Sequence, residues 1–319
     1  MISWRRGFSV VLLLGMLVSS SFGIAGIGIH WGNDFTLHME DKDEWVAFED
    51  LNIDTAGITG TLPNALLSGI SGSDLPIYIS RTDWRNTRIN GGLKVFIDVI
   101  PVLDAVELST NFGLWEYDGS ITYPTGLEYV GGANYANVTN PEELFTPEYD
   151  TLPITLENYD AGFGGLRKTP YMKLQFDLTI RKYIAQLPPV VKILKLYGGG
   201  GISLSFATPV LSKSLIEDAL GESIEGVGNL DDLTNLFSEQ NTLPSGQTPS
   251  EAIVKELLGR LMTPHFGMHI DLGVMVKIPV IPLGVYVDGK FMIPFGDMDK
   301  YVDIGGLGIL LNSGISLTF

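Results

Sequence analysis

One segment of this chain alternates strictly between apolar and polar residues over ten positions. Its apolar side consists of Met172, Leu174, Phe176, Leu178 and Ile180, and its polar side of Lys173, Gln175, Asp177, Thr179 and Arg181. A period of two predicts a β-strand with two different faces. An apolar sandwich core would not tolerate three charged side chains on the inner face. The segment therefore predicts a strand with an apolar outer face and a polar, enclosed inner face.

Seven further segments share this period. They are Ile27 to Trp31 or beyond, Leu93 to Val99, Val106 to Trp115, Leu194 to Phe206, Phe266 to Ile278, Leu283 to Phe295 and Ile309 to Phe319. A strand of about 9–11 residues, tilted, crosses a bilayer. The pattern predicts an all-β chain, a closed antiparallel up-and-down transmembrane β-barrel of about eight strands.

The connections between these segments differ in length. Three are short and carry proline, which ends strand pairing: 99–104, 185–190 and 278–282. The others are long, about 32–92, 117–170 and 207–264, with a shorter one near 296–303. Short turns alternating with long loops are typical of outer-membrane barrels. The first loop could hide a further hairpin if 75–80 pairs with another part of it, which gives the alternative of ten strands.

Charged residues on the inward face form the candidate site. The predicted lumen network contains Lys94, Asp98, Glu107, Lys173, Asp177, Arg181, Lys195, His269, Asp271, Lys277, Asp288 and Lys290. Without His269 these are six basic and five acidic groups. An eight-stranded barrel is only wide enough for side chains to fill it. We therefore expect a plugged, charge-paired lumen in which the network has a structural role.

Aromatic residues gather near the strand ends, as expected of the two interfaces of a membrane. Those toward the loops are Trp31, Trp115, Tyr117, Tyr171, Phe206 and Phe295, and those toward the turns are Tyr183 and Phe319.

The N-terminal residues have the layout of a secretory signal. Arg5 and Arg6 precede an apolar run, 8–18, which is followed by small residues. We expect residues 1–23 to be a signal peptide cleaved after Gly23 or Ala25, and 24–319 to form one barrel domain. The paired arginines also allow a twin-arginine signal, but no cofactor motif follows.

The C-terminal strand carries the clearest motif. Ile315, Leu317 and Phe319 share an apolar face with Ile309 and Leu311, and the chain ends on the aromatic residue. This strand resembles the sorting strand of small Gram-negative outer-membrane β-barrel proteins, although Ser313 departs from the pattern and Leu317 stands where tyrosine is common. The resemblance implies an outer-membrane location and recognition by the barrel-assembly machinery. The alternative is the last strand of a soluble sheet.

Composition narrows the classes of partner. A formal net charge of −17 excludes nucleic acid as an expected partner. The absence of cysteine excludes disulfides and thiolate metal sites. Acidic clusters at 40–44, 49–50, 142–143, Glu148 and Asp150 offer oxygen ligands, but no calcium loop motif is present, so we expect a solvated acidic surface and no metal or cofactor.

The third loop carries a helix signal. Thr248-Pro-Ser-Glu251 is a capping box with proline at the first helical position. A second cap is expected at Ser214-Leu-Ile-Glu217, and the loop should hold two or three short helices. Their apolar residues Val254, Leu257, Leu258 and Leu261 either pack on each other and cover the barrel mouth, or form a pocket for a small hydrophobic ligand.

Two other features bear on chemistry. Three of the four histidines, His30, His265 and His269, face inward near the loop end, but no Ser, His and acid triple can be assembled from the sequence. The run 198–201 is four glycines inside a predicted strand, which indicates tight barrel curvature because the following Lys-Ser/Thr of a phosphate loop is missing.

The sequence predicts a non-enzymatic outer-membrane barrel with a role in surface binding, adhesion or envelope structure, surrounded by outer-membrane lipid. The alternative is a transporter or binder of small hydrophobic molecules, and the third candidate is a lipid hydrolase. An apolar tunnel or lateral wall gap would favour transport, and a serine within hydrogen-bond reach of an inward histidine would favour an enzyme.

Overall fold

A computed structural model describes residues 25–35, 42–46, 77–87, 90–98, 104–129, 145–156, 166–188, 192–225, 227, 230–260, 264–278, 281–296 and 308–318. Several predictions lie outside these residues: the signal peptide and its cleavage site, the terminal Phe319, Leu261, and the acidic clusters at 40–41, 49–50 and 142–143. None of the helices in the described part of the chain is long and apolar enough to cross a membrane.

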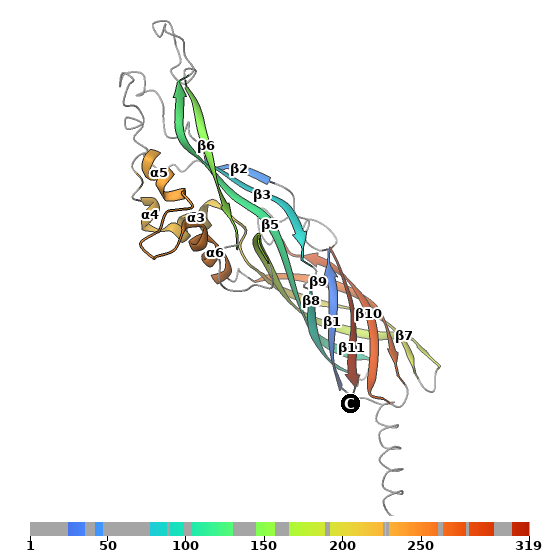
Figure 1. Ribbon diagram of the computed structural model, residues 1–319. Coiled ribbons are helices and arrows are strands. Elements are labelled where there is room, and N and C mark those ends of the chain that lie inside the picture. The colour runs from blue at the N-terminus through green and yellow to red at the C-terminus, as the bar shows by residue number, and fades with distance from the viewer. Residues whose placement is uncertain are drawn as a thin grey trace, which may run out of the picture.

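The predicted barrel is confirmed. Eight antiparallel strands pair in the order β1, β4, β5, β7, β8, β9, β10 and β11, and β11 pairs with β1 to close the ring (Figure 1). Their bounds are β1 Ala25–Asp34, β4 Gly91–Ile97, β5 Ala105–Tyr129, β7 Thr169–Leu187, β8 Leu194–Ala207, β9 His265–Lys277, β10 Leu283–Pro294 and β11 Gly308–Thr318. Each strand predicted from the alternation is present.

Burial along the strands follows the same alternation. In β9, for example, exposed Met268, Ile270 and Leu272 alternate with buried His269 and Asp271. Strands β4, β7 and β9 end, and strands β5, β8 and β10 begin, at the end of the barrel where β1 begins and β11 ends (Figure 1). This end of the barrel is called the turn end, and the opposite end is called the loop end.

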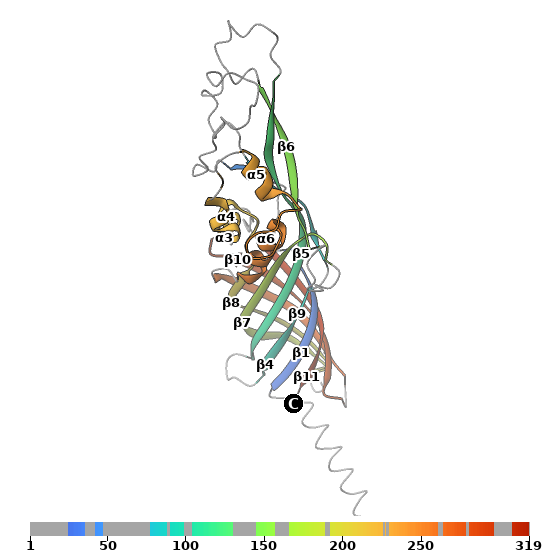
Figure 2. The same ribbon diagram turned by 60° about the vertical axis from the view of Figure 1, so that its left-hand side comes forward.

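Strand β5 is more than twice as long as the predicted strand, and its C-terminal half leaves the barrel. It has 25 residues, and its C-terminal half pairs with β3 (Ile77–Asn86) and β6 (Phe145–Ile154) above the loop end. β3 also pairs with β2 (Lys42–Val46). The predicted loops 32–92 and 117–170 are therefore wrong in part, because each contains strands that continue the barrel sheet beyond the loop end. This part of the sheet, β2, β3, β6 and the C-terminal half of β5, is called here the extension (Figure 2). The hairpin suspected near 75–80 exists, but it adds no strand to the barrel wall.

The third loop folds into four helical segments in the described residues: α3 Lys213–Leu220, α4 Glu222–Glu225, α5 Leu230–Phe237 and α6 Pro249–Gly259. The predicted capping box of α6 is present, with the Thr248 hydroxyl accepting from the Glu251 amide and the Glu251 carboxylate accepting from the Thr248 amide. The second predicted cap is wrong by two residues, since Ser212 caps α3.

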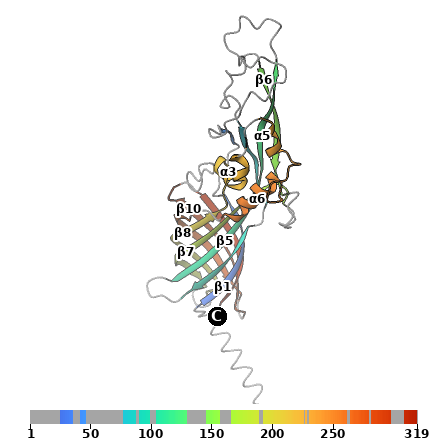
Figure 3. The same ribbon diagram turned by 90° about the vertical axis from the view of Figure 1, so that its left-hand side faces the viewer.

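These helices and one face of the extension enclose the apolar core of the loop end. Ile79, Ile121 and Leu152 of the sheet belong to one buried cluster with Val254 and Leu257 of α6. Leu258 packs against the same cluster. The helices lie beside β5 and β6 of the extension in Figure 1, and Figure 3 shows them above the barrel. Three of the four residues predicted as a ligand loop therefore pack on the protein itself, and Leu261 lies outside the described residues.

This core also corrects the predicted aromatic girdle. Trp31 and Phe295 point outward with 59% and 60% of their surface exposed, as expected of interfacial residues. Trp115, Tyr117 and Tyr171 instead lie in the core of the loop end, because β5 and β7 continue beyond the barrel wall there.

Candidate functional site

The predicted lumen residues come together inside the barrel. Ten of the twelve are buried, and Asp98 and Lys277 are half-buried at the turn end. They fall into layers along the axis, because inward positions on neighbouring strands lie at the same height.

The central layer surrounds Arg181. Its guanidinium contacts the carboxylate of Glu107, lies 2.6 Å from that of Asp271 and 3.6 Å from that of Asp288. The Lys94 ammonium lies 3.5 Å from both Glu107 and Asp288. Arg181 and Lys94 thus form ion pairs with three carboxylates that are almost inaccessible to solvent.

Two tyrosine rings complete this layer. The Lys94 ammonium lies 3.0 Å from the ring centre of Tyr286, and the Arg181 guanidinium 4.3 Å from that of Tyr197. A cation over an aromatic face is attracted by the ring quadrupole, and the attraction is stronger where water is excluded. The rings also fill the space between the charged groups.

The next layer toward the loop end is built on Asp177. Its carboxylate accepts hydrogen bonds from Lys290 at 2.7 Å, Ser203 at 2.7 Å, Gln175 at 2.8 Å and Asn111 at 3.2 Å. A buried carboxylate requires such partners because desolvation of an unpaired charge is costly. The arrangement holds Asp177 in one position.

One ion pair lies at each end of the lumen. Lys173 donates to Asp34 at 2.9 Å near the loop end. Lys195 donates to Asp98 at 3.0 Å near the turn end, where the Tyr183 hydroxyl donates to the same carboxylate. Lys277 lies beside Lys195. The network therefore extends through the full length of the barrel.

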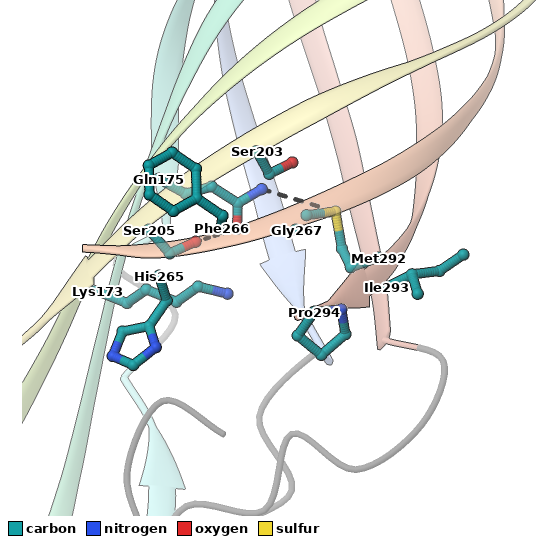
Figure 4. Close-up of a pocket in the computed structure, with 10 residues that line it drawn as sticks. All are labelled: Lys173, Gln175, Ser203, Ser205, His265, Phe266, Gly267, Met292, Ile293 and Pro294. Atoms are coloured by element: carbon teal, nitrogen blue, oxygen red, sulfur yellow. Dashed lines mark hydrogen bonds between the residues drawn. The ribbon is translucent and has the colours of Figure 1, made fainter. Parts of the chain in front are cut away.

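Two cavities near the loop end have volumes of about 20 and 10 Å³, each about the size of one water molecule. Lys173, Gln175, Ser203 and Ser205 surround the first of them (Figure 4). Neither of these two cavities is an apolar tunnel, and Lys173 lines both of them.

A serine does lie within reach of an inward histidine. Ser203 Oγ is 2.9 Å from His269 Nδ1, and Thr179 Oγ1 is 2.8 Å from His269 Nε2. In a catalytic triad the serine gives its proton to histidine, and an acid orients the other ring nitrogen. Here the acid, Asp177, accepts from Ser203, and Thr179 holds the other ring nitrogen. The three residues resemble a triad in composition but differ from it in connectivity.

Several members of the network were missed by the charge-based prediction. They are Asp34, Ser109, Asn111, Tyr183, Tyr197, Ser203, Tyr286 and Asn312. Each lies on the inward face of its strand, so the alternation itself could have identified them. Within the described ranges, no group of three or more His, Cys, Asp or Glu side chains is placed to hold a metal ion.

The fold and the lumen together define this chain as a closed eight-stranded β-barrel protein with an ion-paired interior and a sheet extension beyond its loop end. Comparison of the sequence with models of known protein families and with curated proteins found no match.

Proposed function

We propose that this chain is an integral outer-membrane β-barrel protein, without enzymatic activity, whose extension serves as a binding or adhesion surface outside the cell. The observation that carries the proposal is the outer wall: all eight barrel strands present large apolar side chains that are at least 37% exposed. Soluble proteins rarely expose continuous apolar patches larger than a few hundred Å². A wall that is apolar on every side is the surface that lipid covers.

The outward face of β5 supports a membrane boundary near the loop end. Leu108 and Phe112 are exposed and apolar, whereas Asp118, Ser120 and Thr122 follow on the same face. Lys168 donates to both Asp83 and Asp118 at this height. The change from apolar to charged and hydroxyl side chains on one strand is what a strand leaving a bilayer requires.

The lumen supports a role other than that of a channel. Its buried Lys, Arg, Asp and Glu side chains are ion-paired, and the two cavities described above have room for about one water molecule each. In this proposal lipid covers the barrel wall and side chains fill the lumen, whereas the extension projects from the loop end, where a partner can bind it. In this proposal the barrel anchors it, and β11, with Ile315 and Leu317 outward, is the strand that the barrel-assembly machinery recognises.

Cell fractionation and surface proteolysis test this proposal. We expect the protein in the outer-membrane fraction after a carbonate wash, and we expect protease added to whole cells to cut within 207–264 or the extension while the barrel strands remain protected. Recovery from periplasm or medium without detergent would contradict the membrane location. Complete resistance of whole cells, with cleavage only after lysis, would contradict the surface role of the extension.

The Ser203–His269 contact supports a second candidate, an outer-membrane hydrolase acting on lipid esters. Hydrolysis of a diacyl phospholipid or a short-chain nitrophenyl ester by the reconstituted protein, abolished in Ser203→Ala and retained in Ser205→Ala, would establish it. Absence of ester turnover by the wild-type protein, measured in folded, reconstituted samples, would exclude it. The first proposal is preferred because Asp177 accepts the Ser203 hydrogen bond and both residues are buried.

A further inference from the structure

An apolar groove lies on the outside of the barrel wall. It has a volume of about 380 Å³ and is formed by β1 and its neighbours β4, β11 and β10. Its lining residues are Ile27, Gly28, Ile29, Leu93, Lys94, Val95, Leu283, Ile315 and Leu317. Six of the seven large apolar ones are exposed by 38% or more. The groove is thus far larger than the two cavities of the lumen.

Two glycines lie on the inward face of β1 beside the groove. A Cβ on Gly26 would overlap the Phe96 ring, and one on Gly28 would lie 3.1 Å from Cγ of Lys94. The β1 backbone therefore rests directly on side chains that fill the lumen.

The groove occupies the half of the wall nearest the turn end. Leu283 is the first residue of β10, and Ile27 and Leu317 are paired near the ends of β1 and β11. Exposed Ile97 and Val285 lie two positions along their strands from the groove residues Val95 and Leu283. Under the proposed function this half faces the periplasmic leaflet, where the turns lie.

From this geometry we infer that the groove is a binding site for one acyl chain of a phospholipid of the periplasmic leaflet. The inference rests on the proposed membrane location. The occupant is a hydrocarbon chain because the large side chains at the surface of the groove are aliphatic and Lys94 is directed into the lumen, where it pairs with Glu107 and Asp288. A long, flexible chain gains by burial against such a surface in proportion to the apolar area covered.

Native mass spectrometry of the detergent-solubilised protein, titrated with a diacyl phosphatidylethanolamine, tests the inference. Ile29→Trp fills the groove, and Ile202→Trp makes the same change at an exposed position of β8 that does not line it. We expect the wild type and Ile202→Trp to retain one phospholipid. Ile29→Trp should bind about ten-fold more weakly, since loss of contact with about two methylene groups has that effect.

The inference would be overturned if the two variants retained phospholipid equally, or if the wild type retained only detergent. It would also be overturned if the wild type bound lipopolysaccharide in preference to phospholipid. Heat-dependent migration on gels establishes that each variant is folded, and Val95→Phe is the replacement if Ile29→Trp does not fold. Carbonate extraction of the same variants separates the two proposals. A membrane-embedded protein without phospholipid selectivity contradicts only the groove, whereas a protein released by carbonate contradicts the membrane location as well.

Discussion

At the scale of single residues, the lumen depends on a few buried cations. Arg181 contacts Glu107, Asp271 and Asp288 with almost no exposure to solvent. Removing one partner from such a group leaves uncompensated charge in a place that water does not reach. The penalty for that exceeds the net value of the ion pairs themselves.

We therefore expect Arg181→Leu to lower the free energy of unfolding by about 3–5 kcal/mol. Urea titration in liposomes, followed by tryptophan fluorescence, measures this change. Arg260→Leu is the control, because its ion pairs with Glu256 and Asp218 are exposed and should contribute less than about 1 kcal/mol. Equal effects of the two substitutions would mean that the lumen network is not closed to water.

Glycines in β8 give a second residue-scale prediction. A Cβ on Gly201 would overlap the carbonyl oxygen of Leu178 on β7, whereas one on Gly198 would meet only the flexible ends of Ile184 and Leu272 at 3.2 Å. Gly201→Ala should therefore destabilise the barrel by about 1–3 kcal/mol, and Gly198→Ala by clearly less. The same urea titration compares the two. If Gly198→Ala is the more damaging, close strand packing is not the reason for the glycine run.

The ion cluster where the extension meets the barrel predicts a pH dependence. Hydrogen bonds from Lys168, and then Arg85, lower the pKa of Asp83. A carboxyl group with a lowered pKa stabilises the folded state above its unfolded pKa of about 3.9, and this contribution is lost as the pH falls through the folded pKa. Amide hydrogen exchange in β3, corrected for intrinsic rates, should therefore accelerate in acid. Asp83→Asn should weaken this acid dependence. An unchanged acid dependence in that variant would assign the effect to other groups.

At the scale of elements, the helices of the third loop form a core with the extension. Val254 and Leu257 of α6 are fully buried there, and α6 begins at the capping box that the sequence predicts. This packing explains why α6 needs no ligand to cover its apolar side.

Leu257→Ala should accordingly lower the stability of this core by about 2–5 kcal/mol. We expect faster proteolysis within 207–264 and unchanged protection of the barrel strands, measured by limited digestion of reconstituted protein. Lys255→Ala, an exposed position on the same helix, is the control. Tighter binding of a hydrophobic probe to wild type than to Leu257→Ala, without any change in proteolysis, would instead support a ligand pocket.

The sequence predicts the barrel elements better than the extension. Strand alternation identifies the wall because each barrel strand separates exposed apolar positions from buried polar positions in the lumen. The continuation of β5 was missed because its outward face changes to Asp118, Ser120 and Thr122, although buried Tyr117, Ile121 and Tyr123 keep the same period. The Ser203–Asp177 and Ser203–His269 contacts depend on the stagger between β7, β8 and β9, which single-strand patterns do not contain.

At the scale of the whole molecule, the chain combines two cores of opposite character. The barrel has charged residues inside and apolar residues outside, whereas the extension and helices have an apolar core and a polar surface. These two arrangements meet at the loop end, where β5 belongs to both. An inverted barrel next to an ordinary core is the organisation expected of a protein that is half in lipid and half in water.

Site-directed spin labelling tests this central claim most directly, because the chain contains no cysteine and single labels can be placed freely. In liposomes, spin labels at Ile315→Cys and Leu317→Cys should collide with oxygen dissolved in lipid. A label at buried Ser316→Cys should collide neither with oxygen nor with a water-soluble nickel complex. Labels at Ser120→Cys and Thr122→Cys of the extension should collide with the nickel complex. If the β11 labels are as accessible to the nickel complex as those of the extension, the wall faces water and the account is wrong.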